Sequence, residues 1–136
     1  MADTNENTAL EQAREQMQRQ VIAQQNDAFR QALGVNAFWH AAELLGRCVT
    51  TPGFRELPAE VKRQMIVKVM NFNTFTEEND PWEDHSFGVV EEGEHKIFWK
   101  IDLYDTAYSY GVGELDDAAD PEKCRRVLTL YLPIEH

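Results

Sequence analysis

Residues 85–104 read HSFGVVEEGEHKIFWKIDLY, and this stretch decides the fold class. Apolar and polar side chains alternate on both sides of Glu92-Gly93, which is the pattern of two strands that each bury one face. Glycine in a two-residue connection permits the positive φ that a tight hairpin needs. The stretch therefore predicts an antiparallel hairpin in which His85 pairs with Lys100 and Val90 with His95.

This register assigns the side chains of the hairpin to two faces. The face expected to pack against helices carries Val90, Ile97, Trp99, Ile101 and Leu103. The opposite face carries His85, Phe87, Val89, Lys96, Phe98, Lys100, Asp102 and Tyr104. His85 then lies opposite Lys100, with Asp102 diagonal to it and close enough for a carboxylate to orient an imidazole.

The rest of the chain supplies mostly helical patterns before the hairpin. Residues 1–7 are predicted to be a flexible tail, and the capping box Thr8-Ala9-Leu10-Glu11 starts a polar helix that ends near residue 33. The expected elements that follow are a short buried helix over 37–45, a strand over 47–51, a helix over 58–71 and a closing strand over 125–132. In this scheme His40 lies among apolar neighbours and packs in the core.

Helices followed by strands are typical of an α+β protein. The chain has 136 residues, of which 43% are hydrophobic, enough for one core but not for two. We therefore expect a single α+β domain over residues 8–136, with N-terminal helices packed on a small antiparallel sheet of three to four strands.

The net charge of −11 is concentrated in one segment. Residues 71–122 carry fifteen acidic side chains and only two lysines. Such a field repels nucleic-acid phosphates and attracts a basic protein surface or divalent cations, although acidity also serves solubility alone. The candidate partner-binding residues are Glu77, Glu78, Asp80, Glu83, Asp84, Glu114, Asp116 and Asp117.

Several protein classes lack support in the sequence. It contains no P-loop, no G-x-G-x-x-G, no G-x-S-x-G, no H-E-x-x-H and no C-x-x-C. Neither a secretory signal nor a membrane-spanning stretch is present, so we expect a cytoplasmic protein that does not enter the membrane. Cys48 and Cys124 are expected to be unpaired thiols of a reducing compartment.

The polar end of the hairpin is the candidate for chemistry. His85, Asp102 and Lys100 are the candidate catalytic residues, and Asp80, His85 and Asp102 could together hold a divalent metal, the one cofactor considered. Two alternatives stay open. Asp80 could serve its own turn, since Asn79-Asp80-Pro81 is turn chemistry. The whole group could equally be a hydrogen-bonded surface network without activity.

Three stretches carry a resemblance to a known family. Residues 79–88 read NDPWEDHSFG, residues 99–105 read WKIDLYD and residues 126–129 read RVLT. With NDAFR at 26–30, they resemble the bacterial domain-of-unknown-function family 3768, which shows N-D-P-x-x-E-H-D-F-G and W-K-I-D-Y-Y-D there. The resemblance spans residues 22–132. It implies a small bacterial cytoplasmic protein often found on plasmids and other mobile elements, without an established activity.

This chain departs from the family pattern in three places. Asp84 stands where the family shows Glu, and Ser86 stands where it shows Asp, so a metal or acid role is not expected at position 86. Residues 35–45 look like an insertion.

Three functions compete on this evidence, and the sequence does not decide whether the protein is an enzyme. The favoured interpretation is a non-enzymatic acidic protein of mobile-element type that inhibits a basic partner, such as a protein that handles nucleic acid. The first alternative is a small metal-assisted hydrolase that uses Asp80, His85 and Asp102. The second is an antitoxin-like or oligomeric assembly protein whose first helix, with a thin apolar stripe, pairs with another helix.

Overall fold

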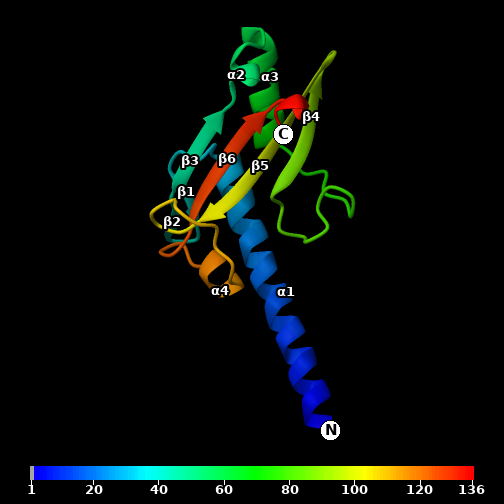
Figure 1. Ribbon diagram of the computed structural model, residues 1–136, viewed down its shortest axis with the longest axis vertical. Helices are drawn as coiled ribbons and strands as arrows, with labels where there is room; N and C mark the ends of the chain where they lie inside the picture. The colour runs from blue at the N-terminus through cyan, green and yellow to red at the C-terminus, as the bar shows by residue number, and fades with distance from the viewer. Residues whose placement is uncertain (1) are drawn as a thin grey trace.

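A four-stranded sheet with helices on one face forms the body of the computed structural model, which describes residues 2–136 and their side chains from residue 6 on (Figure 1). The strand order is β3-β6-β5-β4. The strands are β3 (Gly46–Thr50), β4 (Phe87–Glu92), β5 (His95–Tyr104) and β6 (Arg125–Tyr131). The helices are α1 (Ala2–Gln31), α2 (Pro52–Arg55), α3 (Ala59–Met70) and α4 (Leu115–Ala118), and η1 (Pro133–Glu135) ends the chain. The α+β prediction is confirmed.

The sheet is mixed rather than wholly antiparallel. β6 pairs antiparallel with β5 but parallel with β3. A parallel pair needs a long crossover, and the segment that contains α2, α3 and the β4–β5 hairpin supplies it. Because β3 and β6 are far apart in the sequence, no local pattern reveals that they are neighbours.

The β4–β5 hairpin forms with its predicted faces but with another register. Val90 pairs with Ile97 and Glu92 with His95, so the turn is Gly93-Glu94, and Gly93 has a φ of +61°. The register thus lies two residues from the predicted one, because glycine takes the first turn position instead of the second. A shift of two residues keeps each side chain on its face, and Ile97 and Trp99 are fully buried.

Two other predictions are wrong. The segment expected as a short helix forms a hairpin of β1 (Ala37–Trp39) and β2 (Ala42–Leu44), and His40 is exposed in its turn with a φ of +54°. This hairpin packs on α1, where the Trp39 indole donates to Gln24 at 3.2 Å, so tertiary contact overrides local propensity. Residues 2–7, expected to be part of a flexible tail, belong to α1; Met1 lies outside the described residues.

The C-terminal half of α1 is part of the core, while its N-terminal half projects away from the body of the domain (Figure 1). Ile22 and Phe29 are buried, and the same face buries polar side chains as well. Arg126 of β6 donates to Asn26 at 2.8 Å and to Gln25 at 2.6 Å. These bonds hold α1 at a set position against the sheet.

Cys48 is exposed and Cys124 is buried, and both are free thiols, as expected. Within residues 2–136, no helix combines the length and the apolar character that crossing a membrane requires.

Candidate functional site

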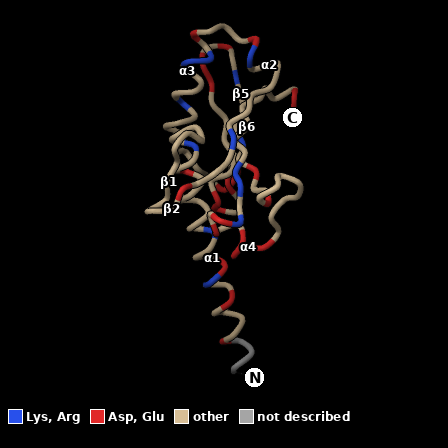
Figure 2. Tube along the Cα trace, turned by 90° about the vertical axis from the view of Figure 1, so that its left-hand side faces the viewer, with Lys and Arg blue, Asp and Glu red and all other residues tan. Residues whose placement is uncertain are grey.

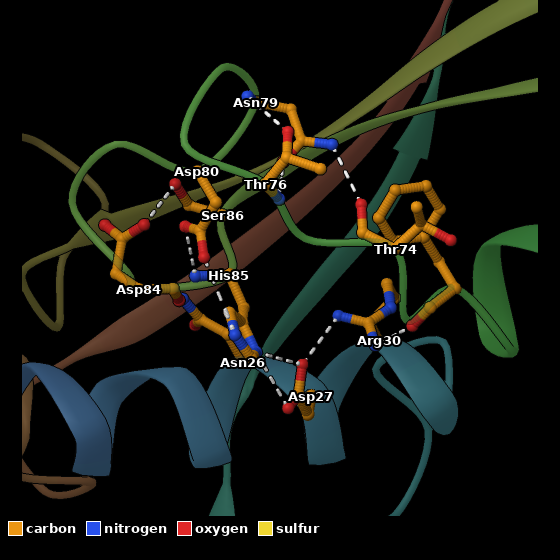
Figure 3. Close-up of polar contacts among 11 residues, drawn as sticks. Asn26, Asp27, Arg30, Thr74, Thr76, Asn79, Asp80, Asp84, His85 and Ser86 are labelled. Atoms are coloured by element: carbon orange, nitrogen blue, oxygen red, sulfur yellow. Dashed lines mark hydrogen bonds and ion pairs between the residues drawn. The ribbon is translucent and has the colours of Figure 1, made fainter.

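The loop between α3 and β4, residues 71–86, folds over the C-terminal half of α1 and builds a polar site there (Figure 3). Asn79 shapes its first turn: its side chain accepts from the Thr76 amide at 2.9 Å and donates to the Thr74 carbonyl at 2.9 Å. Asp80 shapes the second turn: its side chain accepts a hydrogen bond from the His85 amide at 3.0 Å. Asp80 thus folds its own loop, as one interpretation of the sequence anticipated.

His85 is held on the helix side of the sheet. It precedes β4 and has a φ of +55°, so its side chain does not follow the alternation of the strand. Its Nδ1 lies 2.9 and 3.0 Å from the two carboxylate oxygens of Asp27. Its ring stacks on Phe75 with 3.7 Å between centroids and 2° between planes. The contacts with Asp27 and Phe75 together hold the imidazole ring in one orientation.

Asp27 is itself held from behind by a buried cation. Arg30, which is 1% exposed, donates to Asp27 at 3.0 Å, to the Val69 carbonyl at 3.0 Å and to the Phe72 carbonyl at 2.9 Å. Burial lowers the pKa of Arg30, and the neighbouring Asp27 carboxylate opposes that shift. The result is a chain of contacts from Arg30 through Asp27 to His85.

Asp80 lies on the other side of the imidazole. Its Oδ2 is 3.6 Å from His85 Nε2, and the residue is only 7% exposed. Burial raises the pKa of the Asp80 carboxyl, and the hydrogen bond from the His85 amide partly counteracts the rise. Two carboxyl groups thus flank one imidazole, but only the Asp27 carboxylate is within hydrogen-bond distance of a ring nitrogen.

These groups border an open cleft of about 900 Å³ between α1 and the loop. Its walls include Gln20, Gln24, Asp27, Thr76, Asp80 and His85. The remaining lining residues are Ala23, Phe75, Glu77, Pro81 and Glu83, so none of the described residues that line the cleft is Lys or Arg. The charged groups that line the cleft are therefore acidic, apart from His85 when it is protonated.

The cluster predicted from the sequence does not form. Lys100 and Asp102 lie on the opposite face of the sheet, where they make an ion pair of 3.3 Å, while His85 faces α1. The proposed metal set of Asp80, His85 and Asp102 is therefore wrong. Throughout the described part of the chain, no three His, Cys, Asp or Glu side chains are grouped so that they could hold a metal ion.

Sequence reasoning missed Asp27 and Arg30 as members of the site. A signal was present: Gln25, Asn26 and Arg30 lie at helical spacing from the apolar Ile22 and Phe29, so they share one face of the helix with them. Polar side chains on a core-facing stripe need buried partners. That requirement points to a polar network but does not identify the partners.

The predicted partner-binding acids lie in the 71–86 loop and in the segment from Glu114 into α4, both beside the middle of α1. Figure 2 shows acidic residues, in red, next to α4. Asp80 is buried and Asp84 is half-buried, with its carboxylate accepting from Ser86. Asp116 pairs with Arg14 at 2.6 Å, and Asp117 with Lys123 at 3.6 Å. Among the predicted partner-binding acids, four are exposed and form no ion pair with a described cation: Glu77, Glu78, Glu83 and Glu114.

Comparison with known proteins gives a family but no activity. Neither a curated protein nor a solved structure matches the chain. The matching family model is described as a protein of unknown function (DUF3768) and covers residues 50–135, which include the 71–86 loop and all strands of the sheet except most of β3. The chain therefore belongs to the DUF3768 family.

Proposed function

We propose that this protein binds a basic surface of a partner protein through an acidic rim made of Glu77, Glu78, Glu83 and Glu114. These four carboxylates come from two loops that are distant in the sequence and flank the middle of α1. The two loops meet beside α1, because Glu114 lines the same hollow as Trp82 and Asp84, so their negative charges act together. Such a field steers a basic partner and selects against an acidic one.

The observation that carries the proposal is that none of the four rim glutamates forms an ion pair with a described cation. Among the described side chains, three acids at the far end of the domain have partners: Glu60 pairs with Arg63, Glu91 with Lys96, and Glu92 with Lys68. The rim glutamates have none. No ion pair within the described part of the chain therefore competes with a basic partner for these four carboxylates.

An exposed aromatic side chain supports the same surface. Trp82 is 68% exposed, adjoins Glu83 and has Arg19 5.9 Å from its ring. Tryptophan is enriched among the residues that dominate binding energy at protein interfaces. The partner that we propose is a basic protein of the kind that handles nucleic acid, and the protein would inhibit it by covering its basic surface.

Two triple variants of equal net charge test the proposal. One replaces Glu77, Glu78 and Glu83 by Gln, and the other replaces Glu60, Glu91 and Glu92 by Gln. Cross-linking followed by mass spectrometry in a host lysate identifies captured proteins, and calorimetry with the purified partner gives the affinity. We expect the rim variant to lose binding and the distal variant to keep it, with affinity falling steeply as salt rises. Equal binding by both variants, or salt-insensitive binding, contradicts the proposal.

A second candidate function, assembly through α1, is favoured by its projecting half. Leu10 and Met17 lie one heptad apart on it and are 69% and 67% exposed. A helix of this kind gains stability by pairing its apolar stripe with another helix. Mass measurement in solution of the full chain and of the variant Leu10→Glu/Met17→Glu tests this: a wild-type monomer contradicts self-assembly.

A further inference from the structure

The imidazole of His85 has one ring nitrogen that the fold leaves unused. Nδ1 faces the Asp27 carboxylate, which only accepts hydrogen bonds, so Nδ1 carries a proton. In the neutral imidazole, Nε2 then holds a lone pair. No described residue lies within hydrogen-bond distance of Nε2, whose nearest ionic neighbour is Asp80 Oδ2 at 3.6 Å. His85 is thus in the tautomer of a base and lines the cleft with its basic nitrogen unoccupied.

The groups around His85 match the requirements of general-base chemistry. A base needs a fixed tautomer and orientation, which here come from Asp27, from Arg30 behind it and from the stacked Phe75. No Ser or Cys side chain lines the cleft. The hydroxyl of Thr76, which does line the cleft, accepts from the Asn79 amide at 3.4 Å and makes no contact with His85 among the described hydrogen bonds. The nucleophile that we assign to His85 is therefore a water molecule, and the 3.6 Å spacing lets one water bond both Nε2 and Asp80 Oδ2.

The cleft also restricts the charge of its ligand. Among the described residues, its lining includes Asp27, Glu77, Asp80 and Glu83 but neither Lys nor Arg, an arrangement that disfavours phosphate esters and other anions. Gln24 uses its carbonyl oxygen to accept from the Trp39 indole, which can only donate, and its amide nitrogen is thereby left as a donor. A carbonyl oxygen is a suitable acceptor for that nitrogen.

We propose that this cleft is a hydrolytic site in which His85 Nε2, oriented by Asp27, activates water to cleave carboxylic esters that are neutral or positively charged. This activity goes beyond the binding of a basic partner and does not depend on it. Nε2 takes one proton from water as the water oxygen bonds to the carbonyl carbon. The tetrahedral intermediate then loses its alcohol oxygen, which takes the proton back from Nε2. The products are a carboxylic acid and an alcohol, and His85 returns to its neutral form.

Three p-nitrophenyl esters that differ in charge test the substrate class: those of glycine (cationic), acetic acid (neutral) and succinic acid (anionic). We expect kcat/KM of the protein comprising residues 1–136 to decrease in that order. The variant His85→Gln should lose about 10²- to 10⁴-fold in rate, which is the usual contribution of a general base. His95→Gln is the matched control, because His95 is at the β4–β5 turn, far from the cleft lining, and should leave the rate unchanged.

Asp27 is a positioning residue, and its test needs a readout besides rate. Nitrogen NMR of the histidine rings should show His85 with its proton on Nδ1 in the wild type, and a mixture of tautomers in Asp27→Asn. The pH profile of hydrolysis should shift in that variant, while circular dichroism reports that it is folded. Wild-type rates no higher than those of folded His85→Gln, a preference for the succinate ester, or an Nε2-protonated His85 would each overturn the proposal. Partner capture that depends on the rim glutamates would be unaffected by any of these results.

Discussion

Replacing Arg30 by Met should reveal how strongly the buried guanidinium holds the 71–86 loop on α1. Arg30 makes three charged hydrogen bonds, to Asp27 and to the carbonyls of Val69 and Phe72, and each such bond contributes about 1.5–3 kcal/mol. In the variant, the Val69 carbonyl still accepts a hydrogen bond from the Phe72 amide, and Asp27 still has its contact with the His85 ring. These remaining partners compensate part of the stability that the three lost hydrogen bonds contributed. Methionine also avoids the desolvation cost of a buried guanidinium, which offsets a further part of the lost stability. We expect a net destabilisation of about 3 kcal/mol.

Urea denaturation followed by tryptophan fluorescence measures this change. With an m-value of about 2 kcal/mol/M, the midpoint should fall by roughly 1.5 M. The control is Arg63→Met, which removes an exposed ion pair to Glu60 and should change stability by less than about 0.5 kcal/mol. Hydrogen exchange should show faster exchange over residues 71–86 in Arg30→Met. A loss below about 1 kcal/mol, or unchanged exchange in the loop, would refute the argument that this cation anchors it.

Two further outcomes follow from the geometry. Gly46→Ala should destabilise the protein by more than about 2 kcal/mol in the same urea assay, because a Cβ there would overlap the carbonyl oxygen of Arg126, whereas Gly113→Ala, with open space around it, should be close to neutral. Burial raises the folded-state pKa of Asp80, so its stabilising contribution is present below the unfolded pKa and is lost as pH rises through the folded pKa. Asp80→Asn, which keeps an acceptor for the His85 amide, should therefore match or exceed wild-type stability at pH 7 and lose this advantage in acid; a clear destabilisation at pH 7 would contradict the pKa argument.

The sequence by itself determined the fold class and the faces of the central hairpin. Alternation of period two places Ile97 and Trp99 on the buried face, and a register shift of two residues leaves that assignment intact. It also determined the Asp80 turn and the acidity of residues 71–122. These features depend on residues within a few positions of one another, so local chemistry is enough to predict them.

Only the tertiary structure decided which groups form the site. Asp27 and His85 are 58 positions apart, and their contact depends on the loop lying across α1 and on the left-handed backbone of His85. That backbone turned the imidazole away from Lys100 and Asp102, which a continuous strand would have placed beside it. The parallel pairing of β3 with β6 likewise joins segments that are far apart in the sequence. Such contacts are set by how whole elements pack and by which buried polar groups need partners, and neither property is encoded in a short stretch of sequence.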